Sequence, residues 1–264
     1  MIDPDRVLTS RDNAHVKHLR ALAHDARARR EAGQTVLDGP HLVDAALGAR
    51  AKVVELVVAE PARTRVEVQE ILGRWNGPTT VLAGPLFAWV SPVESPTGIL
   101  AILAVPPRPA LGDAIGDWVV LDRIQDAGNV GTILRTAAAA GVGTVILTPG
   151  CAQAWSPKVL RAGMGAHFVL DIIEADEGED ILVHFHGIRL ATGVGAGARS
   201  LYDWDLRGPV AWLLGSEGQG LSSGLLAQAQ GQVVIPMTVG VESLNVGAAA
   251  AICLFEQVRQ RQGR

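Results

Sequence analysis

Short apolar segments alternate with amphipathic helical patterns along most of this 264-residue chain, and this alternation constrains its fold more than any other feature. In the second half, strands are predicted at 118–124, 210–215 and 233–237, with helices at 129–141 and 245–259. Strands that alternate with helices build a mostly parallel sheet, and strands that are apolar throughout are covered on both faces. The sequence therefore predicts an α/β fold.

The first hundred residues carry a smaller version of the same pattern. Apolar strands are predicted at 34–39 and 53–60. A helix with apolar residues at helical spacing is predicted after "TSRDN", with Ser10 or Asp12 as its N-cap. This part of the sequence predicts a small α/β domain of its own.

Prolines and glycines concentrate between the two patterns. Segment 107–116 holds two prolines and two glycines, a composition typical of a linker. The predicted organisation is a small domain at 1–106, a linker at 107–116 and a larger domain at 117–264.

Composition excludes several classes of protein. The chain is 48% hydrophobic and 19% charged, which is typical of an ordered globular protein. Its apolar stretches are shorter than the about 20 residues of a membrane span, and the first residues lack a signal-peptide core, so a cytoplasmic protein without a membrane partner is expected. Cys151 and Cys253 are expected to be buried, reduced thiols. His184 and His186 share one face of a strand predicted at 181–190, but no third ligand lies nearby, so no metal site is expected.

The net charge of −4 conceals a basic segment near the start. From Arg11 to Arg30 there are six basic and two acidic side chains, a local charge of 6 − 2 = +4. A basic segment on a mildly acidic protein is typical of a selective RNA contact. A solvated helix face is the alternative.

Three segments repeat one local design: an apolar strand, a turn rich in glycine and polar groups, and then a helix. They lie at 119–142, 211–222 and 233–252. Ligands of open α/β sheets collect at the carboxyl ends of the strands, so the three turns predict one shared pocket. The run "GVGAGA" from Gly193 lacks the third glycine position of a dinucleotide fingerprint and no helix follows it, so a surface loop is expected there.

Two side chains of the first turn are candidates for chemistry. Asn129 precedes the predicted helix, and Arg135 lies among apolar residues inside it. A guanidinium in such a place needs an anion or a carboxylate, because it does not lose its charge cheaply. The alternative to a functional anion is a buried pair with Asp122 or Asp126.

The other two turns add three candidates. Glu217 follows a strand among glycines whose backbone N–H groups are free to hold a ligand, although a plain glycine turn is the alternative. Ser243 and Asn245 precede the last helix, where a helix-capping role alone would also explain them.

Together, these segments closely resemble the motifs of the SpoU (TrmH-like) class of SPOUT RNA methyltransferases, over roughly residues 117–260. "DRIQDAGNVGTILRTAAAAG" resembles the first motif and carries Asn129 and Arg135. "LLGSEGQGLS" resembles the second and carries Glu217. "IPMTVGVESLNVGAAAAICLFE" resembles the third, with Ser243, Leu244 and Asn245. The segment "SPKVLRAGMGA" resembles the one between the first two motifs and holds Arg161.

The front part, from "LTSRDNAHVKHLRAL" to "VLDGPHLVDAAL", resembles the L30e-like RNA-binding domain that precedes the catalytic domain in many members. The resemblance implies that this domain selects the RNA. The residues expected to contact RNA are Arg11, Asn13, Lys17, Arg20 and, from the larger domain, Arg161.

The resemblance also implies a deep trefoil knot, S-adenosylmethionine as methyl donor, and a homodimer formed through the C-terminal domain. The expected cofactor-binding residues are Leu214, Gly215, Ile235, Met237, Leu244 and Asn245. The expected catalytic residues are Arg135, Asn129, Glu217, Ser243 and Asn245.

The implied reaction is methylation of a ribose 2'-hydroxyl, with ribosomal RNA favoured over transfer RNA because of the front domain. Guanidinium stays protonated, so Arg135 is expected to clamp a phosphate and the ribose oxygen rather than act as a base. The alternatives are a transfer-RNA methyltransferase, a non-catalytic RNA-binding protein, and a nucleotide-dependent oxidoreductase.

Overall fold

The chain forms two compact units, each with its own sheet. Unit 1 is Met1–Pro107 with Trp155–Phe168, and unit 2 is Arg108–Ala154 with Val169–Arg264. The segment Trp155–Phe168 groups with unit 1 because Leu160 packs into the core of that unit. The computed structural model describes residues 7–111, 116–193, 195, 197–216, 218–240 and 243–263.

The sheet of unit 1 is mixed, with strand order β1-β4-β3-β5-β2. Its strands are β1 (Val7–Leu8), β2 (Gln34–Asp38), β3 (Val53–Ala59), β4 (Thr79–Leu82) and β5 (Ile99–Ala104). β1, β4 and β3 are parallel, and β5 is antiparallel to both β3 and β2. The strands predicted at 34–39 and 53–60 are confirmed, and so is the small α/β domain.

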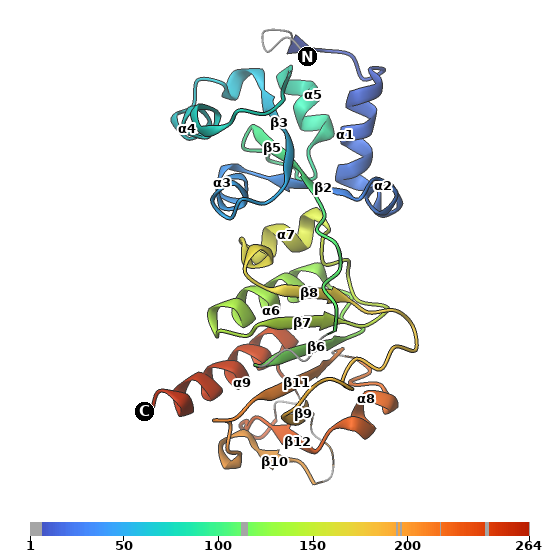
Figure 1. Ribbon diagram of the computed structural model, residues 1–264, viewed down its shortest axis with the longest axis vertical. Helices are drawn as coiled ribbons and strands as arrows, with labels where there is room; N and C mark the ends of the chain where they lie inside the picture. Colours follow the sequence, from blue (N-terminus) through green and yellow to red (C-terminus); the bar gives the residue numbers. More distant parts are fainter. Residues whose placement is uncertain are drawn as a thin grey trace. The chain divides into compact units, whose positions relative to one another are not determined.

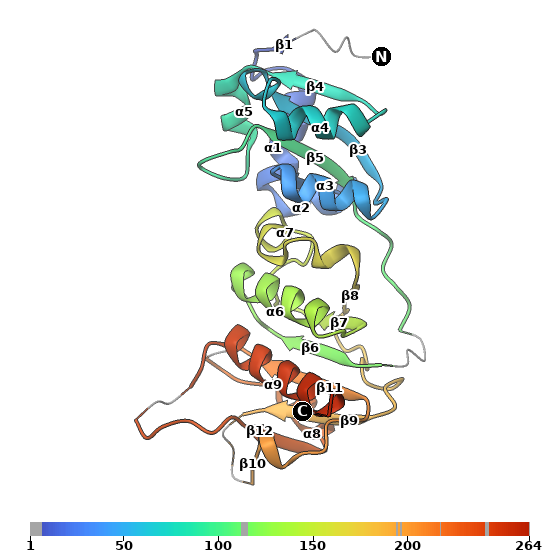
Figure 2. The same cartoon turned by 90° about the vertical axis from the view of Figure 1, so that its left-hand side faces the viewer.

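Helices cover both faces of this sheet, which explains why its strands are apolar throughout. α1 and α5 lie on one face, while α3 and α4 lie on the other (Figure 1; Figure 2). The helices of unit 1 are α1 (Ala14–His24), α2 (Ala26–Ala32), α3 (Pro40–Gly48), α4 (Val66–Arg74), α5 (Gly84–Val90) and α7 (Pro157–Gly163), with 3-10 turns η1 (Glu60–Ala62) and η2 (Ala166–Phe168).

The N-cap of α1 differs from the prediction. Asn13, not Ser10 or Asp12, caps the helix. Its Oδ1 accepts hydrogen bonds from the N–H groups of His15 at 2.9 Å and Val16 at 3.3 Å. Ser10 instead accepts a bond from the N–H of Asp12, which forms a turn ahead of the helix. Several side chains in "TSRDN" suit a cap, and the last of them takes the role.

A partly buried ion pair joins α1 to the sheet of unit 1. His15 Nε2 lies 2.9 Å from Glu55 Oε1, and Glu55 on β3 is 7% exposed. The hydrogen bond to Glu55 raises the pKa of His15, and the coulombic attraction acts in the same sense against the lowering effect of burial. A buried carboxylate needs such a partner.

The stability of the protein is expected to depend on pH through this pair. Protonated His15 attracts the carboxylate of Glu55, and this ion pair stabilises the folded state. The stabilisation is fully present below the ordinary histidine pKa and is lost as the pH rises through the raised pKa of His15. The measurement is urea unfolding of the wild type and of His15→Gln between about pH 5.5 and about pH 8.5. The difference between the two free energies of unfolding should shrink with rising pH. A difference that stays constant would contradict the assignment.

Unit 2 is built on a seven-stranded sheet in which every pair is parallel, with order β10-β12-β9-β11-β6-β7-β8. Its strands are β6 (Trp118–Asp122), β7 (Thr144–Leu147), β8 (Asp171–Glu174), β9 (Ile188–Thr192), β10 (Arg199–Ser200), β11 (Val210–Gly215) and β12 (Gly231–Val234). The predicted mostly parallel sheet is confirmed.

One predicted strand of unit 2 is partly wrong. The strand expected at 181–190 begins only at Ile188, and His184 and His186 lie in the turn before it. The reason is that Phe185 turns inward and packs on Trp118, with ring centroids 5.2 Å apart. The two histidines therefore do not share a strand face.

Helices cover both faces of this sheet as well. The helices of unit 2 are α6 (Ala127–Ala139), α8 (Ser223–Gln228) and α9 (Val246–Arg261), with the 3-10 turn η3 (Leu201–Asp203). α6 and α9 lie side by side on one face, and α8 lies on the other (Figure 1). Trp212 of β11 donates from Nε1 to Gln257 of α9 at 2.8 Å. α9 approaches α6 closely at Gly247, where a Cβ would lie 3.3 Å from Cγ2 of Thr132.

A buried carboxylate fastens the far end of α9. Asp117 is 4% exposed, and its Oδ1 accepts bonds from Val210 N at 3.0 Å and Gln257 Nε2 at 2.8 Å. Arg261, in the last turn of α9, donates to both oxygens of Asp117 and to the carbonyl of Gly208. The hydrogen bond to Asp117 raises the pKa of Arg261. The beginning of β6, the beginning of β11 and the end of α9 are therefore locked together.

Candidate cofactor pocket and substrate surface

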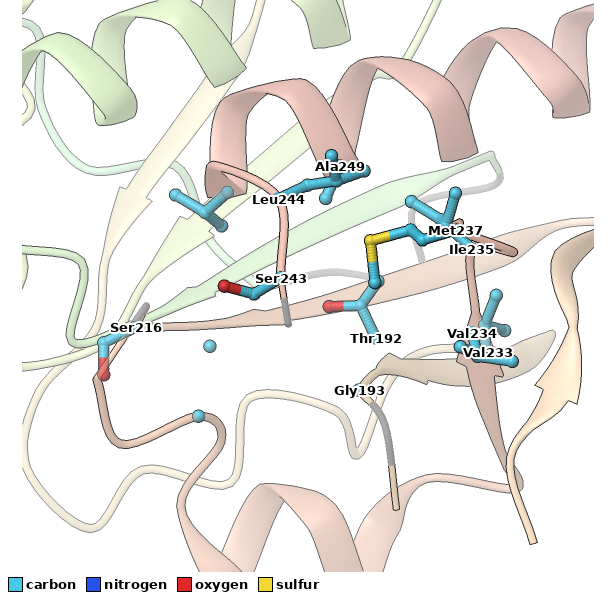
Figure 3. Close-up of a pocket in the computed structure, with 13 residues that line it drawn as sticks. Thr192, Gly193, Ser216, Val233, Val234, Ile235, Met237, Ser243, Leu244 and Ala249 are labelled. Carbon is cyan, nitrogen blue, oxygen red and sulfur yellow. The ribbon is translucent and has the colours of Figure 1, made fainter. Parts of the chain in front are cut away.

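A cavity lies at the carboxyl edge of the sheet of unit 2. The strands β9, β11 and β12 are parallel and end at this edge with Thr192, Gly215 and Val234. The segment that enters α9 closes the cavity from above, and Ser216 lies across it from Ile235 and Met237 (Figure 3). The structure thus brings the second and third polar turns together.

Five of the predicted site residues line this cavity. They are Gly215, Ile235, Met237, Ser243 and Leu244. Apolar side chains dominate the wall, and the hydroxyls of Thr192, Ser216 and Ser243 add a few polar groups. A mostly apolar cleft with a small number of placed polar groups is typical of a small-molecule or cofactor site. The roles of the five residues stay predictions.

The turn after β11 is unusually tight. A Cβ on Gly215 would lie 2.3 Å from the carbonyl carbon of Gly220, so only glycine fits there. The N–H of Gly220 donates to the carbonyl of Ser216 at 2.8 Å, which closes the turn. Glu217, the predicted catalytic carboxylate of this turn, lies outside the described residues.

Asn129 and Asn245 meet although 116 positions separate them. Asn245 Nδ2 donates to Asn129 Oδ1 at 2.9 Å. Asn245 also caps α9, since its Oδ1 accepts from the N–H of Gly247 at 2.9 Å. The capping interpretation of Asn245 is therefore confirmed, and the same side chain links the beginnings of α6 and α9. Asn245 does not line the cavity among the described residues.

Two predicted residues lie elsewhere in unit 2. Leu214 is fully buried in β11. Arg135 is exposed on α6 and, within the part of the chain that the structure describes, forms no hydrogen bond or ion pair. Ile133, Leu134 and Ala137 occupy the inward positions of the helix and leave position 135 on its outer face, so the buried pair weighed as the alternative for Arg135 is not formed with Asp122 or Asp126.

The carboxylates weighed as partners of Arg135 have other roles. Asp122 Oδ1 accepts from Thr148 Oγ1 at 2.9 Å, and its Oδ2 accepts from Ser222 N at 2.6 Å. Asp126 caps α6 by accepting from the N–H of Asn129 at 2.7 Å. Among the described residues, neither Asp122 nor Asp126 is therefore paired with the exposed guanidinium of Arg135.

The basic residues of unit 1 gather around Trp89 of α5. The guanidinium carbons of Arg20 and Arg11 lie 4.1 and 5.1 Å from the centre of the Trp89 ring system, and Arg20 also donates to the carbonyl of Trp89. Lys17 is paired with Asp12 at 3.1 Å. The oxygen of Asn13 is used as the cap of α1, as described above. Trp89 holds two of the predicted RNA-contacting side chains in place.

Arg161 lies on α7 in unit 1. Its side chain is 57% exposed, and Nη1 lies 3.8 Å from Oδ2 of Asp38, whose side chain is 5% exposed. Burial raises the pKa of Asp38, and the charge of Arg161 lowers it to a smaller extent. Most of the guanidinium faces solvent.

The two thiols are free, but only one is fully buried. Cys253 is buried in α9, and burial raises its pKa to about 12. Cys151 is half-buried, contrary to the prediction, because it occupies a loop where its Sγ donates to the carbonyl of Leu121 at 3.3 Å. Neither thiol is activated as a nucleophile.

The described residues contain no group of three or more His, Cys, Asp or Glu side chains placed to bind a metal ion, and none of their helices is long and apolar enough to cross a membrane.

Sequence reasoning missed part of the cavity wall. Thr192, the last residue of β9, and Gly193, which follows it, line the cavity together with Ser216 and Gly220. Gly193 had been expected in a plain surface loop. The available signal was that "RLATG" is an apolar strand that ends in a polar residue and a glycine, but its place beside β11 is set by pairing across the sheet.

The seven-stranded parallel sheet, with a cavity at its carboxyl edge closed by the segment that enters the last helix, defines an α/β protein whose ligand site lies at the strand ends. The profile of the SpoU rRNA Methylase family matches residues 118–255, and that of the MRM3-like substrate binding domain matches residues 13–101. The chain belongs to the SpoU rRNA Methylase family. The resemblance found in the three motifs is thereby confirmed.

Individual relatives are similar along nearly the whole chain. An uncharacterized tRNA/rRNA methyltransferase of Synechocystis sp. is 35% identical over 96% of this chain and 94% of its own length. The 23S rRNA (guanosine(2553)-2'-O)-methyltransferase RlmP of Bacillus subtilis is 29% identical over 94% of this chain and 97% of its own length. The crystal structure of an AdoMet-bound rRNA methyltransferase from Sinorhizobium meliloti aligns with a TM-score of 0.84 at 30% identity, covering 97% of this chain and 98% of that chain.

Proposed function

We propose that this protein transfers a methyl group from S-adenosylmethionine to a ribose 2'-hydroxyl of RNA, and that its substrate is ribosomal RNA. The observation that carries the proposal is the convergence of Gly215, Ile235 and Leu244 on one cavity. Membership of the SpoU rRNA Methylase family supports the reaction. The AdoMet-bound Sinorhizobium meliloti structure supports the donor, and the name of the Bacillus subtilis relative supports 2'-O methylation of ribosomal RNA.

The cavity fits the proposed donor chemically. Ile235, Met237 and Leu244 offer an apolar surface to an adenine ring, and the backbone of the Gly215 turn approaches closely because no side chain intervenes. The hydroxyls of Ser216 and Ser243 suit polar groups of the donor. S-Adenosylmethionine supplies an electrophilic sulfonium methyl group when it is bound.

The residues of the chain align and stabilise the acceptor. Arg135 stays protonated, so it stabilises negative charge that develops on the ribose oxygen while binding an adjacent phosphate. The pair formed by Asn129 and Asn245 couples the helix that carries Arg135 to the segment that carries Ser243 and Leu244. Alignment of the reacting atoms accounts for several kcal/mol of barrier reduction in such sites. Glu217 is proposed to orient the same groups.

We further propose a homodimer formed through unit 2 and a trefoil knot in its chain. Arg135 does not line the cavity of its own chain, and Phe255 on α9 is 48% exposed, which supports an association through α6 and α9. Analytical ultracentrifugation should give twice the monomer mass of 27.7 kDa. Phe255→Glu should give the monomer mass, and a monomeric wild type would refute the proposal.

A cytoplasmic location agrees with the two free thiols.

RNA is proposed to contact unit 1 through Arg11 and Arg20, which are held on Trp89, through Asn13 and Lys17 of the same segment, and through Arg161 on α7. The logarithm of the RNA-binding constant falls linearly with the logarithm of the salt concentration. Each phosphate that a cation neutralises adds about 0.7 to the steepness of this fall for single-stranded RNA. Few aromatic side chains are present, which favours backbone and shape contacts over stacking on several bases.

The double variant Lys17→Ala, Arg20→Ala is expected to reduce the steepness of this salt dependence by about 1 to 2 units and to weaken RNA binding at low salt. Fluorescence anisotropy with a ribosomal RNA fragment at several salt concentrations measures both quantities. Arg63→Ala, which changes an arginine elsewhere on unit 1, is the matched control. An unchanged slope in the double variant would remove this surface from the proposal.

The decisive experiment maps 2'-O-methyl positions in total RNA incubated with and without the protein and S-adenosylmethionine. A new methyl mark in ribosomal RNA is expected. A mark in transfer RNA would move the substrate to the alternative class, and RNA binding without any mark would indicate a non-catalytic protein. Thermal stabilisation by NAD but not by S-adenosylmethionine would indicate an oxidoreductase instead.

A further inference from the structure

We infer that Arg123 is a positioning residue for the proposed reaction: its guanidinium holds Gln219 and Gly220 against the end of β6 and so keeps one wall of the cofactor cavity in place. The identity of the cofactor in this inference rests on the proposed function. The clamp itself rests on contacts within unit 2.

The turn needs support from outside itself. Ser216 and Gly220 line the cavity, and residues 218–220 are exposed. Gly220 donates to the carbonyl of Ser216, and the N–H of Gln219 donates to Ser216 Oγ at 3.4 Å. Exposed backbone hydrogen bonds of this kind open easily unless other elements restrain them.

Arg123 supplies that restraint from the neighbouring strand. Its Nη1 donates to Oε1 of Gln219 at 3.2 Å, and its Nη2 donates to the carbonyl of Gly220 at 3.4 Å. Nε lies 3.5 Å from Oδ1 of Asp122. The planar fork of a guanidinium suits two neighbouring acceptors at once, which the ammonium of a lysine does not reproduce.

The backbone of Arg123 is fixed in an unusual conformation that aims this side chain. Its φ is 55°, in the left-handed region that residues other than glycine seldom adopt. Its N–H donates to Thr148 Oγ1 at 3.2 Å, and a Cβ on Gly150 would lie 3.3 Å from Arg123 Cγ. Strained backbone of this kind persists where the surrounding structure requires it, and it is concentrated at functional sites.

Asp122 fastens the turn at a second point. Its Oδ2 accepts from the N–H of Ser222 at 2.6 Å, two residues beyond Gly220. Two consecutive residues at the end of β6 therefore hold this segment. Arg123 holds Gln219 and Gly220, and Asp122 holds Ser222. The same strand end leads into α6, which carries Asn129 and Arg135. The end of β6 therefore contacts the cavity wall and also continues into α6, the helix with the proposed catalytic arginine.

The test uses Arg123→Gly, which keeps the left-handed backbone accessible and removes the guanidinium that forms the clamp. Arg50→Gly is the matched control, because Arg50 has the same φ of 55° and is exposed on unit 1. Hydrogen exchange of the amides of Gly220 and Ser222 is measured without ligand, and S-adenosylmethionine affinity is measured by calorimetry. For Arg123→Gly, exchange at Gly220 is expected to accelerate by about tenfold or more, and the Kd for S-adenosylmethionine to rise by about tenfold. Arg50→Gly should change neither.

A conservative variant separates positioning from simple loss of charge. Arg123→Lys keeps the charge but not the fork, so it should exchange faster at Gly220 than the wild type does. Unchanged exchange at Gly220 in Arg123→Gly would overturn the inference, whatever the affinity. A wild-type protein that fails to bind S-adenosylmethionine would count against the proposed function, while the exchange data would still decide whether the clamp exists.

Discussion

Replacing Arg135 by alanine is expected to lower the rate of methyl transfer by at least about a hundredfold while leaving the affinity for S-adenosylmethionine within a few fold. The physical reason is the position of the side chain. Arg135 is exposed on α6 and is not among the described residues that line the cavity, so its removal takes away a group proposed to meet the RNA and leaves the cavity wall intact. Single-turnover methylation with radiolabelled donor measures the rate, and calorimetry measures the affinity.

Two comparisons sharpen this prediction. Arg135→Lys keeps a charge without the planar fork and should recover only part of the rate. Arg207→Ala removes another exposed arginine of unit 2, one that is paired with Asp205, and should leave the rate unchanged. Equal losses of cofactor affinity and rate in Arg135→Ala would show that the cavity and the arginine do not have separate roles.

Gly215→Ala should abolish detectable binding of S-adenosylmethionine. The added Cβ would stand 2.3 Å from the carbonyl carbon of Gly220 and 2.4 Å from the nitrogen of Leu221, both backbone atoms that move only if the turn opens. Overpacking of this kind costs about 1–3 kcal/mol in a closed site, and here it displaces the cavity wall itself. Equilibrium dialysis with labelled donor measures the binding.

Gly218→Ala is the matched control within the same turn, because a Cβ there meets no atom within 4 Å. It should bind the donor as the wild type does. Circular dichroism of both variants checks that unit 2 remains folded. Binding by Gly215→Ala within twofold of the wild type would mean that the turn is not a wall of the cofactor site.

Much of the sheet of unit 2 could be predicted because its strands are short apolar runs buried on both faces. β6 and β11 satisfied that pattern without ambiguity. β8 did not, since the pattern of Asp171–Glu174 has only two buried residues between two exposed ones. The misplaced strand before Ile188 had the apolar residues of a strand, but Phe185 and its neighbours pack as a turn against Trp118. Local composition does not distinguish these cases.

The candidate site could be predicted where the turns themselves carry its residues. Gly215, Ser243 and Leu244 follow from that logic, and they meet at the cavity. Thr192 does not, because its contribution depends on β9 lying between β12 and β11, and strand order is set by long-range pairing. Arg123 is also hidden, since its left-handed backbone depends on contacts with Thr148 and Gly150.

The exposure of Arg135 and the grouping around Trp89 show two different limits. For Arg135, the apolar neighbours left a buried pair open as an alternative, whereas the helical phase of Ile133 and Leu134 decides that it points outward. Arg20 and Trp89 are 69 positions apart and meet because α1 packs against α5. The basic segment was visible in the sequence, but the aromatic side chain that orders it was not.

The lock between Asp117 and Arg261 has a consequence for how the protein is made. These two residues are 144 positions apart, and the helix that Arg261 fastens begins at the wall of the cavity. When β6 has been synthesised, Asp117 is present but its partner Arg261 is not yet part of the chain. Ser243, Leu244, Val246 and Ala249 line the cavity, so the cavity is incomplete until this late part of the chain has been synthesised.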